Sequence, residues 1–154
     1  MANQSELTEP AASRARRRVL IVSFAAYKVP EVLEALAAAA ARGVEIRLIL
    51  ETTEDSKGKL SHDAAAAFES LKAAAFYAWP AEKRNTGGAL PASLHAKAVL
   101  TDGIAALVTS ANLTGSAMMS NMELGLLVRG GDVPRRLAEH FDDLIARGEL
   151  RRGV

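Results

Sequence analysis

Short apolar runs of strand length alternate with helix-like segments in the first half of this chain, and that alternation limits the folds available to it. Runs at 19–24, 44–50 and 75–79 predict strands. The leucine- and alanine-rich stretches between them predict helices at 31–42 and 64–74. Strands separated by helices are typical of a sheet that contains parallel neighbours.

The second half differs because strand-like runs follow one another without a helix between them. Three such runs lie at 93–100, 105–109 and 122–128. A final helix begins near Asp132 and Pro134 and has one apolar face, formed by Leu137, Phe141, Leu144 and Ile145. Alternating units followed by hairpin-like strands predict an α/β fold with a mixed β-sheet flanked by helices.

Composition narrows the class of protein. The chain has 154 residues, of which 49% are hydrophobic and 24% charged, as expected for one globular domain with its own core. It contains no cysteine, which excludes disulfide scaffolds, thiolate metal sites and cysteine nucleophiles. The formal net charge of +1 neither requires nor excludes a polyanionic partner.

The N-terminal residues differ in character from the rest of the chain. Residues 1–13 are polar, small and mixed in charge, and four arginines follow at 14, 16, 17 and 18. The apolar run after them is short and is closed by Tyr27 and Lys28, so neither a secretory signal nor a membrane span is expected. We therefore expect a flexible tail over residues 1–17, one domain over residues 18–154, and a cytoplasmic protein.

Polar side chains interrupt the three late strand-like runs at regular spacing. Alternate residues of a strand share a face, so His95 and Lys97 are expected to project together. A buried strand that presents an imidazole and an ammonium needs an anion to meet them. The next run ends in Ser110 and Asn112, again two residues apart, and the third contains Glu123. Adjacent strands are expected to bring these five groups side by side.

The spacing His95-x-Lys97-x4-Asp102, followed by Ser110-x-Asn112, resembles the HKD signature of the phospholipase D superfamily. The composition of the chain predicts only about 0.005 chance matches to the His-Lys-Asp triplet. The resemblance implies a phospholipase D-like fold. Asp102 falls on the strand face opposite to His95, so we expect it to have a structural role.

The resemblance also implies a metal-independent phosphodiesterase that needs no cofactor. His95 is then the nucleophile that attacks phosphorus and forms a phosphohistidine, and Glu123 accepts a hydrogen bond from its other ring nitrogen. Lys97 and Asn112, assisted by Ser110, hold the non-bridging oxygens. Each such donor, if preorganised, lowers the barrier by about 3 kcal/mol.

Two further features qualify this resemblance. The superfamily usually has Gly-Ser-x-Asn, whereas this chain has Thr109 before Ser110. The sequence around 93–128 is also similar to the phospholipase D-like component of phage-defence islands of the DISARM type. That similarity implies partner proteins of a defence system.

The proton donor for the leaving alkoxide is missing from the motif. In this superfamily a second histidine from a second motif supplies it, but neither His62 nor His140 has a lysine two residues further on. We expect a homodimer in which two copies of His95 face each other across a two-fold axis. The alternative is that the sequence is half of a longer protein whose other motif lies elsewhere.

Nucleic acid is the expected substrate, with DNA favoured over RNA, and no membrane partner is expected. Lys83 and Arg84, in the loop before the motif, are candidate contacts to a polyanion or else a solvated loop, and Ser23 is a further candidate. Backbone phosphates would supply most of the affinity, so binding should weaken with salt. Two alternatives stay open: a phospholipase or phosphatidyl-transfer enzyme with the same phosphohistidine, and a non-catalytic nucleic-acid-binding module of a larger defence complex.

Overall fold

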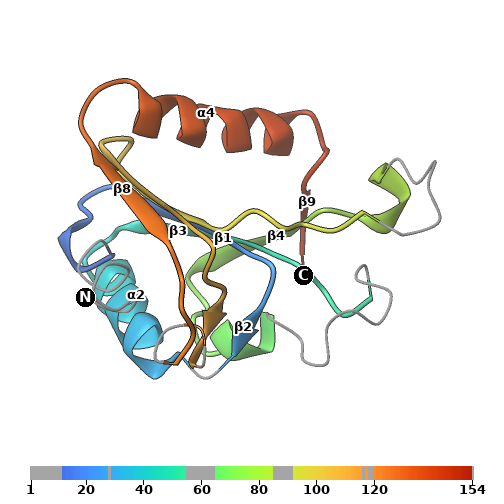
Figure 1. Cartoon of the computed structure of the whole chain (residues 1–154), viewed down its shortest axis with the longest axis horizontal. Helices are drawn as coiled ribbons and strands as arrows, with labels where there is room; N and C mark the ends of the chain where they lie inside the picture. The colour runs from blue at the N-terminus through green and yellow to red at the C-terminus, as the bar shows by residue number, and fades with distance from the viewer. Residues whose placement is uncertain are drawn as a thin grey trace.

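The computed structural model describes residues 12–27, 29–54, 65–84, 92–115, 117 and 120–153 (Figure 1). Its helices in these ranges are α2 (Pro30–Ala41) and α4 (Val133–Ala146), with short 3-10 helices at Ala65–Phe68 and Ala81–Lys83. Its strands are β1 (Arg18–Ser23), β2 (Ala26–Tyr27), β3 (Glu45–Leu50), β4 (Ala74–Ala78), β5 (Ala98–Thr101), β6 (Ala105–Thr109), β7 (Leu113–Thr114), β8 (Gly125–Arg129) and β9 (Arg151–Arg152). Neither described α-helix has the length and apolar character needed to cross a bilayer.

Seven of these strands form one mixed sheet in the order β8-β6-β5-β1-β3-β4-β9. The strands β1, β3 and β4 are parallel, whereas β5, β6, β8 and β9 pair antiparallel. A parallel pair needs a crossover that returns the chain to the same end, and α2 makes that crossover between β1 and β3. The strands β2 and β7 pair in parallel as a separate ribbon. The predicted α/β fold with a mixed sheet flanked by helices is confirmed.

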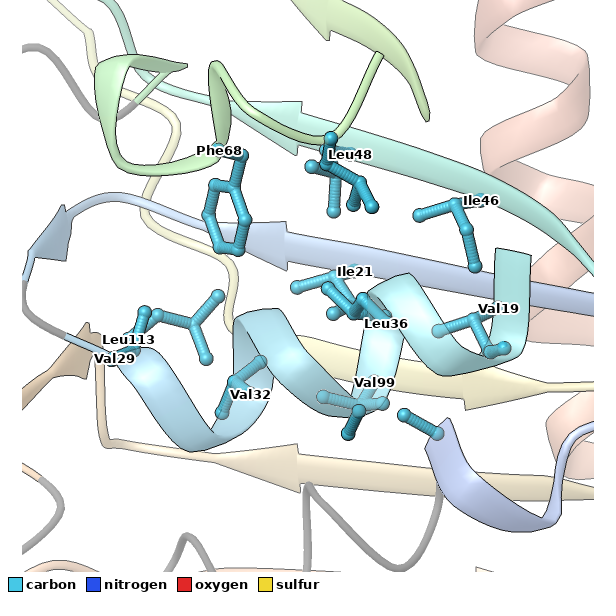
Figure 2. Packing of buried hydrophobic residues seen from close by; sticks show 14 of the residues in the cluster. Val19, Ile21, Val29, Val32, Leu36, Ile46, Leu48, Phe68, Val99 and Leu113 are labelled. Atoms are coloured by element: carbon cyan, nitrogen blue, oxygen red, sulfur yellow. The ribbon is translucent and has the colours of Figure 1, made fainter. Parts of the chain in front are cut away.

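Side chains of β1 alternate between the two faces of the sheet, and each face buries its own apolar cluster. Val19 and Ile21 lie in the cluster under α2, together with Phe68 (Figure 2). Leu20 and Val22 lie in the cluster under α4. All four of these β1 side chains are at most 1% exposed. Burying each of them contributes about 1.5–3 kcal/mol to the stability of the fold. Helices on both faces (Figure 1) explain why this strand is apolar throughout.

Helix α4 covers the second face of the sheet through the apolar face that the sequence predicts. Its packed side chains are Leu137, Ala138, Phe141, Leu144 and Ile145. Asp142 of the same helix forms ion pairs with Arg18 of β1 and Arg47 of β3, both at 2.8 Å. The predicted terminal helix and its apolar face are confirmed.

The N-terminal segment joins the domain earlier than the sequence indicates. Ala12 and Ala15 are 0% and 4% exposed and belong to the cluster under α2. The backbone N–H groups of Arg16 and Arg17 donate to the carboxylate of Asp102. Residues 12–17 therefore pack as part of the domain and not as a tail, and residues 1–11 lie outside the described residues.

One predicted helix is wrong in the residues that the structure describes. The sequence predicts a helix over 64–74, but only the 3-10 helix Ala65–Phe68 forms before β4 begins at Ala74. Alanine propensity alone does not hold a short helix in water, and the pairing of Ala74 with Ile46 draws the chain into the sheet. The sequence does not predict the strands β2, β7 and β9, because two residues are too few to show a periodic pattern.

The strand that carries the motif is shorter than predicted. It begins at Ala98, where its pairing with β1 starts opposite Val22, and β1 itself ends one residue later at Ser23. Residues 92–97 lie outside any strand, so the expected alternation of faces does not hold there. His95 is exposed and Lys97 is buried.

Candidate active site

The predicted site residues gather at one end of the large sheet, which we call the site end. The strands β1 and β6 finish there and β5 and β8 start there, because antiparallel neighbours run in opposite directions. Backbone bonds from Thr109 N to the Lys97 carbonyl (3.2 Å) and from Ser110 N to the Leu124 carbonyl (2.9 Å) join the three segments. The predicted residues in these segments are His95, Lys97, Ser110, Asn112 and Glu123.

The imidazole of His95 is exposed, as a group must be if it is to reach a large substrate. Its ring lies 5.8 Å from the ring of Phe24, which follows β1. Its neighbour in the chain, Leu94, is buried and anchors the segment. The position of the exposed ring is therefore set by the buried neighbour Leu94 and by its contact with the Phe24 ring.

Lys97 is 7% exposed, and its ammonium donates to the carbonyl of His95 at 2.8 Å. Burial lowers the pKa of this lysine below its usual value, and the negative charge of Glu123 opposes that shift in part. A buried cation next to an exposed imidazole creates a positive region where an anion would be stabilised. The lysine also fixes the backbone that carries the histidine.

Ser110 and Glu123 form a tight pair across the gap between β6 and β8. The Ser110 hydroxyl donates to the Glu123 carboxylate at 2.5 Å and accepts from Leu124 N at 3.0 Å. Asn121 donates to the other carboxylate oxygen at 3.3 Å. Among the described residues these are the partners of Glu123, and its expected bond to the His95 ring is not formed in this structure. To form that bond, the Glu123 carboxylate would have to turn from Ser110 toward His95.

Asn112 lies in the turn between β6 and β7. Its Oδ1 atom is buried and has no hydrogen-bond partner in the described structure. Leaving a buried polar atom unpaired costs about 1–3 kcal/mol, so this amide is suited to meet a bound polar group. Rotation of the amide would present its NH₂ to the same space, and that group is the donor a phosphate oxygen needs.

Asp102 lies at the opposite end of β5 from the motif histidine, at what we call the far end of the sheet. Its carboxylate accepts the backbone N–H groups of Arg16, Arg17 and Arg18 at 2.8–2.9 Å. Burial by itself raises the pKa of Asp102, but these three donors and the Arg17 charge lower it below its usual value. Its backbone has a φ of 55°, in the region that Asp and Asn tolerate better than most residues. These contacts fit the expected structural role.

Two predicted nucleic-acid contacts are corrected by the structure. The Ser23 side chain is 1% exposed, and its hydroxyl donates to the Ala25 carbonyl and accepts from Leu113 N. The Arg84 guanidinium is 1% exposed and pairs with Glu51 at 2.6 Å. Both side chains are occupied inside the protein and do not reach a polyanion in this structure. Lys83 is exposed and lies 3.8 Å from Glu149, so its contact with a polyanion stays a prediction.

Glu51 is the residue at this end of the sheet that sequence reasoning missed. It follows β3 directly, is 0% exposed, and accepts Leu94 N at 2.9 Å. In the sequence it reads as the first residue of a polar loop. The available signal was a carboxylate placed immediately after a buried strand, since a charged group at that position needs a partner.

The fold and the site together define a phospholipase D-like domain. A family model described as "Cardiolipin synthase, PLD-like domain" matches residues 10–145, and the chain belongs to this family within the phospholipase D superfamily. Cardiolipin synthase A of Cronobacter sakazakii is 35% identical over 135 residues, which are 86% of this chain and 26% of that protein. The chain thus spans about a quarter of the length of the curated relatives it matches.

Solved structures with the same fold include two bacterial proteins of similar size. NucT from Helicobacter pylori has a TM-score of 0.75 at 16% identity, covering 91% of this chain and 86% of that one. Nuc from Salmonella typhimurium, a phospholipase D family member, has a TM-score of 0.70 at 20% identity, covering 96% and 88%. At such low identity these likenesses show the shared fold alone.

Proposed function

We propose that this protein is a metal-independent phosphodiesterase that cleaves nucleic-acid backbones through a phosphohistidine on His95. The observation that carries the proposal is the exposed side chain of His95 together with the buried ammonium of Lys97, which donates to the His95 carbonyl, at the site end of a phospholipase D-like sheet. A phosphodiester is an anion that resists nucleophiles, so a nucleophile and a fixed positive charge must act together.

The reaction proceeds in two displacements at phosphorus. A ring nitrogen of His95 bonds to phosphorus as the bond to the leaving oxygen breaks, and a second, protonated imidazole gives its proton to that oxygen. Water then attacks phosphorus, the P–N bond breaks, and the second imidazole takes a proton from the water. Lys97 and Asn112 stabilise the non-bridging oxygens in both steps.

The second imidazole comes from a second copy of this chain. Only one His-x-Lys pair occurs in the sequence, and one histidine cannot be nucleophile and acid in the same step. A two-fold axis through the site end would bring two copies of His95 to one phosphate. The proposed active enzyme is therefore a homodimer with a shared site.

An exposed apolar surface beside the site supports this arrangement. It consists of Met122 (98% exposed), Leu124 (82%), Leu126 (67%) and Val108 (44%). Val108 and Leu126 are paired across β6 and β8, and Met122 and Leu124 flank Glu123 of the site. Helix α4 begins after the C-terminal end of β8 (Figure 1), whereas Met122 and Leu124 precede the N-terminal end of that strand. Apolar side chains this exposed are typical of interaction surfaces, and continuity with the site favours a second copy.

Mixing experiments test the shared site directly. Wild type and His95→Ala protein are co-refolded in varied ratios, and activity should follow the square of the wild-type fraction. A linear dependence would show that each protomer acts alone. Leu126→Glu should give an inactive monomer by sedimentation, whereas the matched control Ile104→Glu, on a side chain 62% exposed away from the site, should stay dimeric and active.

The substrate class is tested with plasmid and single-stranded DNA in the presence of excess chelator. The wild type should cut at least one of them, His95→Ala should not, and cleavage should weaken steeply as salt rises because phosphates supply the affinity. Abolition of cleavage by the chelator would refute the metal-independent mechanism. RNA is the parallel substrate that tests the preference for DNA.

A lipid-directed reaction is the second candidate, because the curated relatives that match this chain are named cardiolipin synthases. The same phosphohistidine could transfer a phosphatidyl group to an alcohol. Vesicles of phosphatidylglycerol distinguish the two: release of glycerol with no cleavage of DNA would replace the nuclease proposal. Partner proteins of a defence system, and turnover-free binding within a complex of that kind, stay predictions of the sequence, to be tested by co-purification from a host that encodes such a system.

A further inference from the structure

A buried ion pair lies behind the candidate active site and plays no part in the proposed chemistry. The Glu51 carboxylate and the Arg84 guanidinium are 0% and 1% exposed as side chains, with Oε1 and a terminal nitrogen 2.6 Å apart. Removing two charges from water is expensive, and apolar side chains of similar volume often stabilise a protein as well or better. The arrangement of the pair therefore points to a role other than holding the fold together.

Besides its pair with Glu51, the Arg84 guanidinium contacts the end of β4 and the start of the motif segment, residues 92–97. Its guanidinium donates to the carbonyls of Trp79 and Ala92, both at 3.0 Å, and lies 5.1 Å from the centre of the Trp79 ring. Trp79 follows β4 directly and Ala92 begins the motif segment. The planar guanidinium thus joins the end of β4 to the segment that leads to His95. A lysine ammonium lacks the fixed fork of donors that makes these contacts in several directions.

Glu51 completes the connection on the other side. Its second oxygen accepts the backbone N–H of Leu94 at 2.9 Å, one residue before His95. Residues 92–97 lie outside any strand, and this carboxylate binds the Leu94 N–H, which a longer β5 would have given to a neighbouring strand. On the opposite side of the histidine, the Lys97 ammonium holds the His95 carbonyl.

We propose that Glu51 and Arg84 are positioning residues that fix the His95 backbone for attack on phosphorus. The inference rests on the proposed function of His95 and adds residues that do not touch the substrate. Its physical basis is that a misplacement of a nucleophile by about 1 Å can cost about 10²-fold in rate. The Ala92 carbonyl and the Leu94 N–H lie outside any strand and are bound by Arg84 and Glu51, so these two side chains contribute to the position of the residues just before His95.

The decisive variant replaces both charges at once by apolar groups, Glu51→Leu with Arg84→Met. Because neither charge is left unpaired, the fold should survive with a Tm near that of the wild type. We expect kcat on bis(p-nitrophenyl) phosphate to fall by about 10–100-fold with KM little changed, and the Leu94 amide to exchange faster with deuterium. A folded double variant with wild-type kcat would overturn the proposal, as would a loss of kcat with Leu94 exchange unchanged.

Two further variants keep the test decisive. If the double variant does not fold, Arg84→Lys takes its place: it retains the charge opposite Glu51 but loses the fork to Trp79 and Ala92, and it should lower kcat and speed Leu94 exchange to a smaller degree. Unchanged kcat and exchange in that variant would overturn the proposal. Asp142→Asn, which removes the charge that pairs with Arg18 and Arg47 at the far end of the sheet, is the control and should alter neither readout.

The exchange readout also separates failure of this inference from failure of the proposed function. If the wild type cleaves neither DNA nor the chromogenic diester, the proposed function fails. Faster Leu94 exchange in the double variant would still show that Glu51 and Arg84 fix the backbone before His95. If the wild type is active and His95→Ala is not, the proposed function stands. In that case unchanged kcat in the folded double variant refutes only the positioning role.

Discussion

The two ends of strand β5 differ in what their polar groups do. At the far end, Asp102 accepts three backbone N–H groups, and Asp142 takes up the charges of two arginines. At the site end, His95 is exposed and the Asn112 oxygen is buried with no hydrogen-bond partner among the described residues. Polar groups that the fold satisfies contribute to stability, and those it leaves unsatisfied are available to a ligand. Substitutions at the two ends should therefore separate activity from stability.

The largest effect is expected from His95→Ala. Loss of the nucleophile should lower kcat by at least about 10³-fold, while the free energy of unfolding should change by less than about 0.5 kcal/mol because the ring is exposed. Initial rates and chemical denaturation measure the two quantities. His140→Ala, which removes an exposed imidazole from α4, is the control and should leave both unchanged. Substantial turnover by His95→Ala would remove the basis for a phosphohistidine.

Asn112→Leu should also lower activity without lowering stability, but with a smaller loss of kcat than His95→Ala. Removing the amide from the site should lower kcat by about 10²–10³-fold, the usual effect of losing one preorganised donor. Because the buried oxygen has no partner to lose, the free energy of unfolding should stay the same or rise by up to about 1 kcal/mol. Destabilisation by more than about 1 kcal/mol would show that the amide is a structural group, as at the far end.

Asp102→Asn should give the opposite result. The amide tolerates the backbone φ of 55° but replaces one accepting oxygen with a donor, so the free energy of unfolding should fall by about 1–3 kcal/mol. Activity measured well below the Tm should remain near that of the wild type. Loss of activity in the folded variant would contradict a purely structural role.

The acid dependence of stability follows from the same carboxylate. The pKa of Asp102 is lowered in the folded protein, so the folded state binds this proton less readily than the unfolded state does. Its contribution to stability is complete above the ordinary pKa of 3.8 and is lost as the pH falls through the lower folded value. Denaturation curves between about pH 6 and 2 should therefore slope less for Asp102→Asn than for the wild type.

This comparison also explains what the sequence could and could not predict. The strand runs at 19–24, 44–50 and 105–109 were predictable because a strand buried on both faces or paired in a hairpin leaves a clear apolar pattern. The motif residues were predictable from spacing, but their exposure was not. Lys97 is buried and His95 exposed because β1 ends at Ser23, a tertiary event that no local pattern encodes.

Long-range pairing set the remaining limit. Glu51 and Arg84 are 33 residues apart, and each taken alone resembles an ordinary charged loop residue. Their pairing depends on how the ends of β3 and β4 lie against the motif segment, which no local pattern shows. The sequence alone therefore predicts that Arg84 contacts nucleic acid and that Glu51 is a loop residue. The structural role expected for Asp102, by contrast, agrees with its backbone contacts, although it lies at the other end of β5 from the histidine and not on the opposite face of one strand.

Asp142→Asn should have the smallest effect of these substitutions. Its carboxylate pairs with Arg18 and Arg47 at 2.8 Å, but its side chain is 35% exposed, and partly exposed pairs contribute about 0–1 kcal/mol each. The free energy of unfolding should fall by about 1 kcal/mol in low salt and by less at about 1 M salt, where screening is strong. The control is Asp143→Asn, one residue further along α4 and exposed, which should change stability little at either salt concentration. Because α4 is held mainly by its apolar face, a loss of several kcal/mol that persists in high salt would mean that the far end depends on this carboxylate as strongly as it does on Asp102.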